Sequence, residues 1–192
     1  DAWKGPGDLS ARLYAAWKAD ALHLAVVVQD DKVISASGNT NEWGTVQFDK
    51  CDAVSLSLDG RAPDMQWQKE LNQGTYDATI SPAASGKPIL RPNGKASGSI
   101  QGVVAATNVT ATGYTIEMMI PLTEKNFPAQ QWQRDRPIKL SLLIADSDDP
   151  KSEAPRKTMG WNVSPEQKNS EDTTGWATLV LSDMTSTSWD SP

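Results

Sequence analysis

The feature of this sequence that most constrains its fold is an alternation of apolar with polar or small residues at a period of two. It is clearest at residues 22–28, 54–58, 116–120, 138–144 and 176–180. Successive side chains of a β-strand point to opposite sides, so such alternation is typical of strands that bury one face against a core. The chain therefore predicts several half-buried strands.

Turn-forming residues separate these segments. Weaker candidate strands occupy residues 11–17, 75–80 and 100–107, and residues 18–21 are short enough to close a hairpin after the first of them. Pro121 ends the strand before it, because proline cannot donate a hydrogen bond to a sheet. No stretch of ten or more residues carries a helical stripe. The sequence predicts an all-β fold, namely an antiparallel β-sandwich of two packed, jelly-roll-like sheets with long loops.

Four connections are too long to be simple turns: residues 30–50, 60–74, 81–99 and 146–175. Long ordered loops in a compact domain usually serve function. They are where we look for a site, whereas Trp17 and Trp176 fall on predicted strands and are expected in the core.

The chain has eight tryptophans against two phenylalanines and three tyrosines, more than core filling requires. An indole ring stacks on the flat face of a sugar, while amide and guanidinium groups bond to neighbouring hydroxyls. We therefore predict a sugar-binding set formed by loop residues: Trp161 with Asn162 beside it, then Trp43, Trp67 and Arg91. The alternative for each tryptophan is that it closes an open end of the sandwich.

Composition excludes several classes of function. The formal charge of −6, from 18 basic and 24 acidic residues, argues against nucleic acid as the main partner. No apolar run approaches the roughly 20 residues of a membrane-spanning helix, so no membrane insertion is expected. With a single histidine, His23, no catalytic triad can be assembled, and we expect neither an enzyme nor a catalytic residue.

Acidic residues cluster where two predicted strands end. Asp30 and Asp31 close one strand, and Asp146, Asp148 and Asp149 close another. Calcium takes six to eight oxygen ligands, and carboxylates at strand ends supply them well. We predict a structural Ca²⁺ that pins both loop bases, with a solvated acidic surface as the alternative. No organic cofactor is expected.

Five motifs in order carry a resemblance to a known family. They are Leu22–Asp31 ending in Asp-Asp, Cys51–Asp59, Gly113–Leu122 with its Tyr-x-x-Glu-x-x-Ile-Pro pattern, Leu142–Asp148 ending in Asp-x-Asp, and Gly175–Leu181. In this order and spacing they resemble carbohydrate-binding module family 9 and the wider DOMON-like group. The resemblance covers residues 8–181.

The resemblance implies a single domain over residues 1–181, followed by a linker-like tail at 182–192. It implies a non-catalytic, monomeric module within a longer chain of a bacterial protein that is secreted, periplasmic or at the cell surface. Its partner would be a polysaccharide or oligosaccharide clamped between two tryptophans, and some members of the family contain structural calcium.

The family's site residues carry over only in part. Trp161 with Asn162 matches one clamping position. The other position falls at residues 48–51, which contain no tryptophan, and Ser55 replaces a family carboxylate. The resemblance thus implies the fold more strongly than the site.

Two alternative functions remain open at this point. A haem-binding electron-transfer domain of the same fold group would need two axial ligands, for which His23 and one methionine are candidates: Met65, Met118, Met119 or Met159. A structural or docking module of a larger secreted enzyme is the other alternative.

Overall fold

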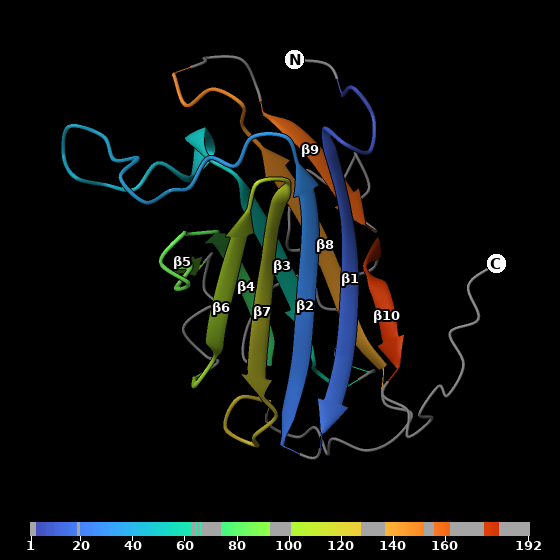
Figure 1. The fold of residues 1–192 in the computed structure, drawn as a ribbon. Coiled ribbons are helices and arrows are strands. Elements are labelled where there is room, and N and C mark those ends of the chain that lie inside the picture. Colours follow the sequence, from blue (N-terminus) through green and yellow to red (C-terminus); the bar gives the residue numbers. More distant parts are fainter. Residues whose placement is uncertain are drawn as a thin grey trace.

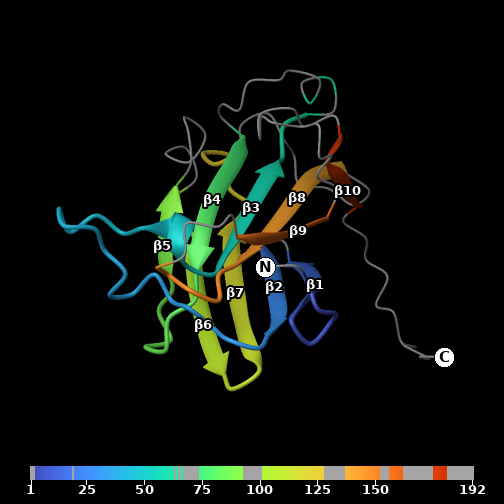
Figure 2. The same cartoon turned by 90° about the horizontal axis from the view of Figure 1, so that it is seen from above.

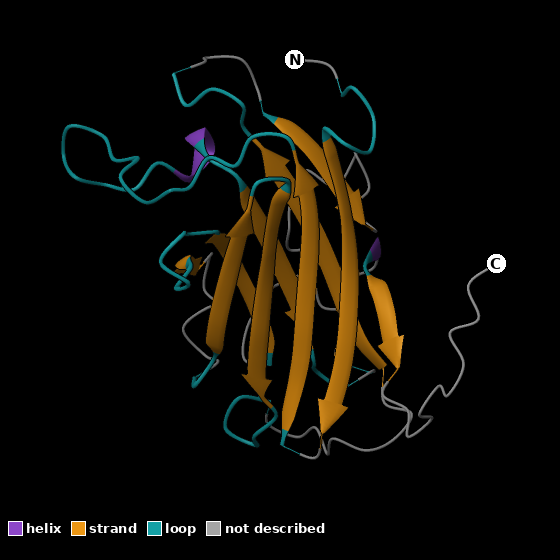
Figure 3. Ribbon diagram, in the orientation of Figure 1, coloured by secondary structure: helices purple, strands orange, loops and turns teal. Residues whose placement is uncertain are grey.

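The computed structural model describes residues 3–18, 20–62, 64, 66, 74–92, 101–127, 137–151, 156–161 and 175–180. Within them two antiparallel sheets pack face to face (Figure 1, Figure 3), so the predicted β-sandwich is confirmed. The residues described include no helix long and apolar enough to cross a lipid bilayer. Residues 181–192, Trp67 and Asn162 lie outside the described residues.

The first sheet has the order β1-β2-β7-β6, and all its neighbouring pairs are antiparallel. Its strands are β1 (Leu9–Lys18), β2 (Ala21–Asp30), β7 (Gly113–Pro121) and β6 (Val104–Thr110). The hairpin predicted between residues 11–17 and 22–29 is confirmed by β1 and β2. The strand expected at residues 100–107 begins and ends later, as β6 does.

The second sheet has the order β10-β8-β3-β4-β5, with β9 paired to β8 beside β10. Its strands are β10 (Ala177–Val180), β8 (Pro137–Asp146), β3 (Ala53–Asp59), β4 (Thr75–Ser81), β5 (Ile89–Pro92) and β9 (Lys157–Trp161). A short 3₁₀ helix, η1 (Phe48–Lys50), precedes β3.

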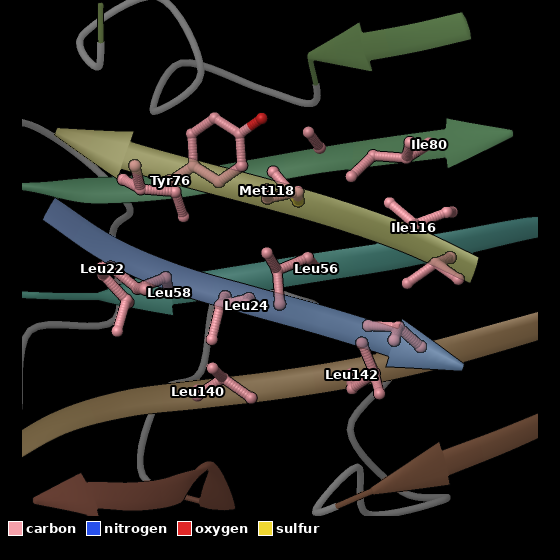
Figure 4. Packing of buried hydrophobic residues seen from close by; sticks show 14 of the residues in the cluster. Leu22, Leu24, Leu56, Leu58, Tyr76, Ile80, Ile116, Met118, Leu140 and Leu142 are labelled. Carbon is pink, nitrogen blue, oxygen red and sulfur yellow. The ribbon is translucent and has the colours of Figure 1, made fainter. Parts of the chain in front are cut away.

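The core consists of the inward-facing residues of both sheets. Figure 4 shows apolar side chains of β2 and β7 meeting those of β3, β4 and β8. Trp176 is buried and Trp17 packs against this core, as predicted for both. The alternating positions read from the sequence are therefore the ones that bury their side chains.

Two strands were missed and lie inside segments predicted to be loops. The strand β5 has four residues at the sheet edge, with three of them exposed, and β9 has the burial of an edge strand. An edge strand exposed on both sides shows no alternation of apolar and polar residues. Arg91 therefore lies on β5 and Trp161 at the end of β9, not in loops.

Candidate functional site

The outer face of the second sheet carries a polar strip. The core residues of β3 and β4 alternate with Ser55, Ser57, Asp77 and Thr79, which consequently point away from the first sheet. The Ser55 and Thr79 hydroxyls lie 3.1 Å apart, and the Ser57 hydroxyl donates to Asp77 Oδ1 at 3.1 Å. Three of these four side chains are buried although they face away from the core. Of these four side chains, the half-buried Ser55 is the one that solvent reaches.

Arg91 lies at the end of this strip. Its register partner on β4 is Thr79, whose partner on β3 is Ser55, so the three side chains share the outer face. The Arg91 guanidinium lies over the Phe48 ring, 4.6 Å from the ring centre. Stacking of this kind holds the guanidinium in place while leaving the donors at its edge directed outward.

Phe48 joins the long loop between β2 and β3 to this face. It is buried in η1, and its carbonyl accepts a hydrogen bond from Arg156 Nη1 at 2.6 Å. Asn39 Nδ2 donates across the loop to the Lys50 carbonyl at 3.0 Å. Figure 2 shows η1 next to β5, and the contact of Phe48 with Arg91 fixes the base of the loop there.

Trp43 is displayed at the tip of the same loop. Asn41 Oδ1 accepts hydrogen bonds from the backbone N–H groups of Trp43 and Thr45, and Gly44 completes the turn in the left-handed region at φ 74°. The Trp43 side chain is 81% exposed. It therefore does not close an end of the sandwich, and a braced turn holds it toward solvent.

Trp161 lies on the other side of the second sheet. Its register partner on β8 is the core residue Leu142, and cross-strand partners share a face. It borders a hollow of about 390 Å³ between the sheet edges, lined also by Leu13, Ile144 and Met159. Trp161 is 46% exposed. The structure thus brings Arg91 next to the loop of Trp43 but does not bring Trp161 to that face.

Three buried aspartates converge at one end of the sandwich. The candidate ligand atoms of Asp30, Asp52 and Asp146 all lie within 4.8 Å of one another. Asp30 Oδ2 and Asp146 Oδ1 are buried and find no hydrogen-bond partner among the described residues. Two bare carboxylate oxygens beside a third carboxylate fit a hard divalent cation such as Ca²⁺. We call these three residues the inner acid cluster.

Asp52 was not predicted, although it lies in the Cys51–Asp59 motif. Its Oδ1 accepts a hydrogen bond from Ser147 N at 2.7 Å, and its Oδ2 accepts one from Ile34 N. These bonds connect the loops that follow β8 and β2. Asp52 therefore holds together the bases of these two loops, which the predicted Ca²⁺ was expected to hold.

Burial dominates the electrostatics of the inner acid cluster. Desolvation, followed by the nearby charge of Asp30, raises the pKa of Asp52 to about 8. Desolvation also raises the pKa of Asp146 to about 6 and shifts the pKa of Asp30 upward. Each shift means that the charged carboxylate is disfavoured in the absence of a cation.

A second group of carboxylates surrounds Lys157. Its Nζ lies 2.9 Å from Asp8 Oδ1, 3.1 Å from Asp146 Oδ2 and 2.7 Å from Asp148 Oδ2. Burial alone would lower the pKa of Lys157, but the hydrogen bonds to these carboxylates outweigh burial and raise it. Lys157 therefore supplies one positive charge to a group of three carboxylates.

The predicted calcium ligands consequently separate into three sets. Asp30 belongs to the inner acid cluster, Asp146 belongs to that cluster and also pairs with Lys157, and Asp148 bonds to Lys157. Asp31 and Asp149 are exposed and belong to neither group.

The candidate haem ligands are also separated. His23 and Met119 are cross-strand partners on the outer face of the first sheet, whereas Met118 is buried in the core and Met159 lies on β9. Met65 lies outside the described residues. Axial ligands must approach iron from opposite sides of a flat macrocycle, whereas adjacent cross-strand side chains project in the same direction. No pair among the described residues matches that requirement.

Comparison with known proteins shows the family of this chain. The family model described as "Carbohydrate family 9 binding domain-like" matches residues 1–184. The chain therefore belongs to this family, a class of non-catalytic carbohydrate-binding modules. The resemblance stated from the motifs is confirmed. No curated protein sequence matches the chain significantly.

Solved structures show the same fold. A carbohydrate-binding module of family 9 from Caldicellulosiruptor kristjanssonii, in complex with glucose, aligns with a TM-score of 0.61 at 15% identity, covering 93% of this chain and 79% of that one. The same module in complex with cellotriose gives a TM-score of 0.61 at 15% identity, with 93% and 77% covered. A structure from Bacteroides uniformis gives 0.57 at 12% identity, with 93% and 82% covered.

Proposed function

We propose that this chain is a non-catalytic module that binds a polysaccharide or oligosaccharide. It would act as part of a longer polypeptide exported by a bacterium. Membership of the family and the saccharide complexes of its structural neighbours support the ligand class. The observation that carries the proposal in this chain is Trp43, an 81% exposed indole on a braced turn whose base stacks under Arg91.

The proposed site divides the chemistry between two parts. Trp43 supplies an apolar platform for the face of a sugar ring. Arg91 supplies donors, and the half-buried Ser55 on the same face supplies a hydroxyl, for the groups on the rim of the ring. Because Asn41 and Phe48 hold these parts before the ligand arrives, little ordering cost is expected on binding.

A titration of Trp43→Ala and Arg91→Ala with a panel of neutral oligosaccharides that includes cellotriose tests the proposal. We expect each variant to lose at least tenfold in affinity and Trp43→Ala to retain its melting temperature, because Trp43 buries little surface. Trp161→Ala, on the other side of the sheet, is the matched control and should bind normally. A wild-type chain that binds no member of a broad glycan panel would overturn the proposal.

We further propose that the inner acid cluster holds a structural Ca²⁺, as expected from the sequence. The bare oxygens Asp30 Oδ2 and Asp146 Oδ1 support it, because Lys157 approaches Asp146 at its other oxygen, Oδ2, and no described cationic side chain forms an ion pair with Asp30 or Asp52. The cluster lies between the loops that follow β2 and β8, so the ion would stabilise the fold and would not contact the sugar.

Removal of the ion tests this second proposal. At a free Ca²⁺ concentration 100-fold above its dissociation constant, binding contributes about 2.7 kcal/mol. For a domain of this size that corresponds to about 5–11 °C in melting temperature, lost in a chelator and restored by calcium. Asp30→Asn keeps the acceptor for Lys32 N at 2.7 Å and should abolish the calcium response, whereas the exposed Asp31→Asn should keep it. An unchanged melting curve in excess chelator would contradict the proposal.

A further inference from the structure

The outer face of the first sheet contains a hollow that the site above does not use. It has a volume of about 400 Å³ and lies over β1, β2, β7 and β6. Ligand pockets for small molecules begin at about 300 Å³. The hollow is therefore large enough for a small ligand, and it faces away from the sheet that bears Arg91.

The strand register explains why the face is hollowed. Glu117 on β7 lies between Ala25 on β2 and Ala106 on β6, so both of its neighbours across the sheet are small. Tyr14 on β1 is the next residue beyond Ala25 and is 49% exposed. Val104, on the far strand β6, is 58% exposed. A low floor thus lies between a tyrosine on one side and a valine on the other.

The bottom of the hollow carries polar side chains that have no hydrogen-bond or ion-pair partner among the described residues. Glu117 and His23 are exposed, and neither they nor Tyr14 makes a hydrogen bond or ion pair with another described residue. Both Glu117 and His23 line the hollow together with Tyr14. A carboxylate accepts bonds from two adjacent hydroxyls, a neutral imidazole both donates and accepts, and a phenol ring stacks on a C–H face.

We propose that this hollow is a second binding site for a neutral saccharide, an inference that rests on the proposed function. Glu117 would accept hydrogen bonds from neighbouring hydroxyls, Tyr14 would stack on the ring, and His23 would bond to a third position. An acidic sugar is disfavoured because Glu117 would repel its carboxylate and the chain carries a net charge of −6. A module with one site on each sheet would be bivalent toward a polysaccharide.

The experiment combines calorimetry with amide chemical shifts on the whole chain. A panel of neutral trisaccharides that includes cellotriose is titrated into the wild type, Tyr14→Ala, Glu117→Gln and Trp43→Ala. We expect two binding events per wild-type chain. Tyr14→Ala and Glu117→Gln should each weaken only the event that shifts amides of β2 and β7, by at least tenfold. Asn108→Ala, on the same face beside Thr115, is the control and should bind as the wild type does.

The polymer gives an independent readout. A soluble polysaccharide built from the sugar that binds should have about 100-fold higher affinity for the wild type than for Trp43→Ala or Tyr14→Ala, each of which keeps one site. This gain requires that one polysaccharide molecule reaches both sites of the same protein molecule. The amide shifts decide the inference when the polymer cannot span the two sites.

The outcomes separate this inference from the proposed function. One binding event, lost in Trp43→Ala and unchanged in Tyr14→Ala, would overturn the second site and leave the proposed function standing. No binding to any glycan would overturn both. The amides of β2 and β7 could instead shift only when the protein self-associates, with Tyr14→Ala abolishing these shifts. That result would show that a second copy of the protein covers this face, and it would also overturn the saccharide site.

Discussion

Replacement of Trp161 by alanine distinguishes a packing residue from a sugar platform. The register of β9 on β8 places the Trp161 side chain on the face of Leu142, at the hollow between the two sheets. Its position there predicts that Trp161→Ala loses stability and keeps sugar binding. The family resemblance, which aligns Trp161 with a clamping tryptophan, predicts the reverse.

The expected loss follows from the burial of this side chain. Trp161 is 46% exposed, so about half of its surface, roughly 100–130 Å², is removed from water in the folded chain. At about 25 cal/mol per Å², that surface contributes about 2–3 kcal/mol to the free energy of unfolding. A domain of this size loses about 2–4 °C per kcal/mol, so the melting temperature should fall by about 4–12 °C. The hollow opens to solvent, and no further term for a closed cavity is expected.

Thermal denaturation and sugar titration of the same preparations make the measurement. Trp43→Ala is the matched control, because an 81% exposed indole contributes little to stability and its melting temperature should change by less than about 2 °C. The reasoning is refuted if Trp161→Ala melts like the wild type and no longer binds sugar. In that case Trp161 is a sugar platform, and the β9 register given above is wrong.

Two further predictions concern the framework. Tyr76 Oη is buried without a hydrogen-bond partner among the described residues, so Tyr76→Phe should raise the free energy of unfolding by about 1 kcal/mol at pH 7, measured by urea denaturation. Burial raises its pKa to about 12, so the stability present below pH 10 in the wild type is lost toward pH 12, and the variant should lose less. Gly113→Ala should abolish folding at 37 °C, seen by circular dichroism, because its Cβ would lie 2.0 Å from the Val28 carbonyl oxygen at φ 134°.

The fold was predictable because its central strands carry apolar residues on the face toward the core and mostly polar or small residues on the other face. Residues 22–28, 54–58, 116–120 and 138–144 have an apolar residue at every second position, and each segment lies in a core strand. The two strands that were missed are edge strands, in which neither face is buried along the whole length. Contact of one strand face with an apolar core produces a period of two in the sequence. Strands that lack a continuous core face therefore show no such alternation.

The inner acid cluster was predictable in kind but not in membership. Asp30 and Asp146 end strands, and carboxylates at strand ends are visible in the sequence. Asp52 comes one residue before a strand and is distant in sequence from both Asp30 and Asp146. Only the antiparallel pairing of β3 with β8 brings it beside Asp146. Lys157 is a similar case, because its strand was not predicted and the cation it brings to Asp148 was therefore unexpected.

The face on which Trp161 lies depends on a register that the sequence leaves open. In β9, Gly160 and Thr158 face outward while Met159 and Trp161 face the core side, as the pairing with Leu142 and Ile144 requires. A shift of one residue in this pairing would exchange the two sets and bring the indole to the face of Arg91. Neither arrangement violates the local sequence, since a glycine and a threonine are tolerated on both sides. In the observed register Trp161 lines the hollow together with Leu13 and Ile144, so the stability of Trp161→Ala measures whether burial at this hollow decides between the two faces.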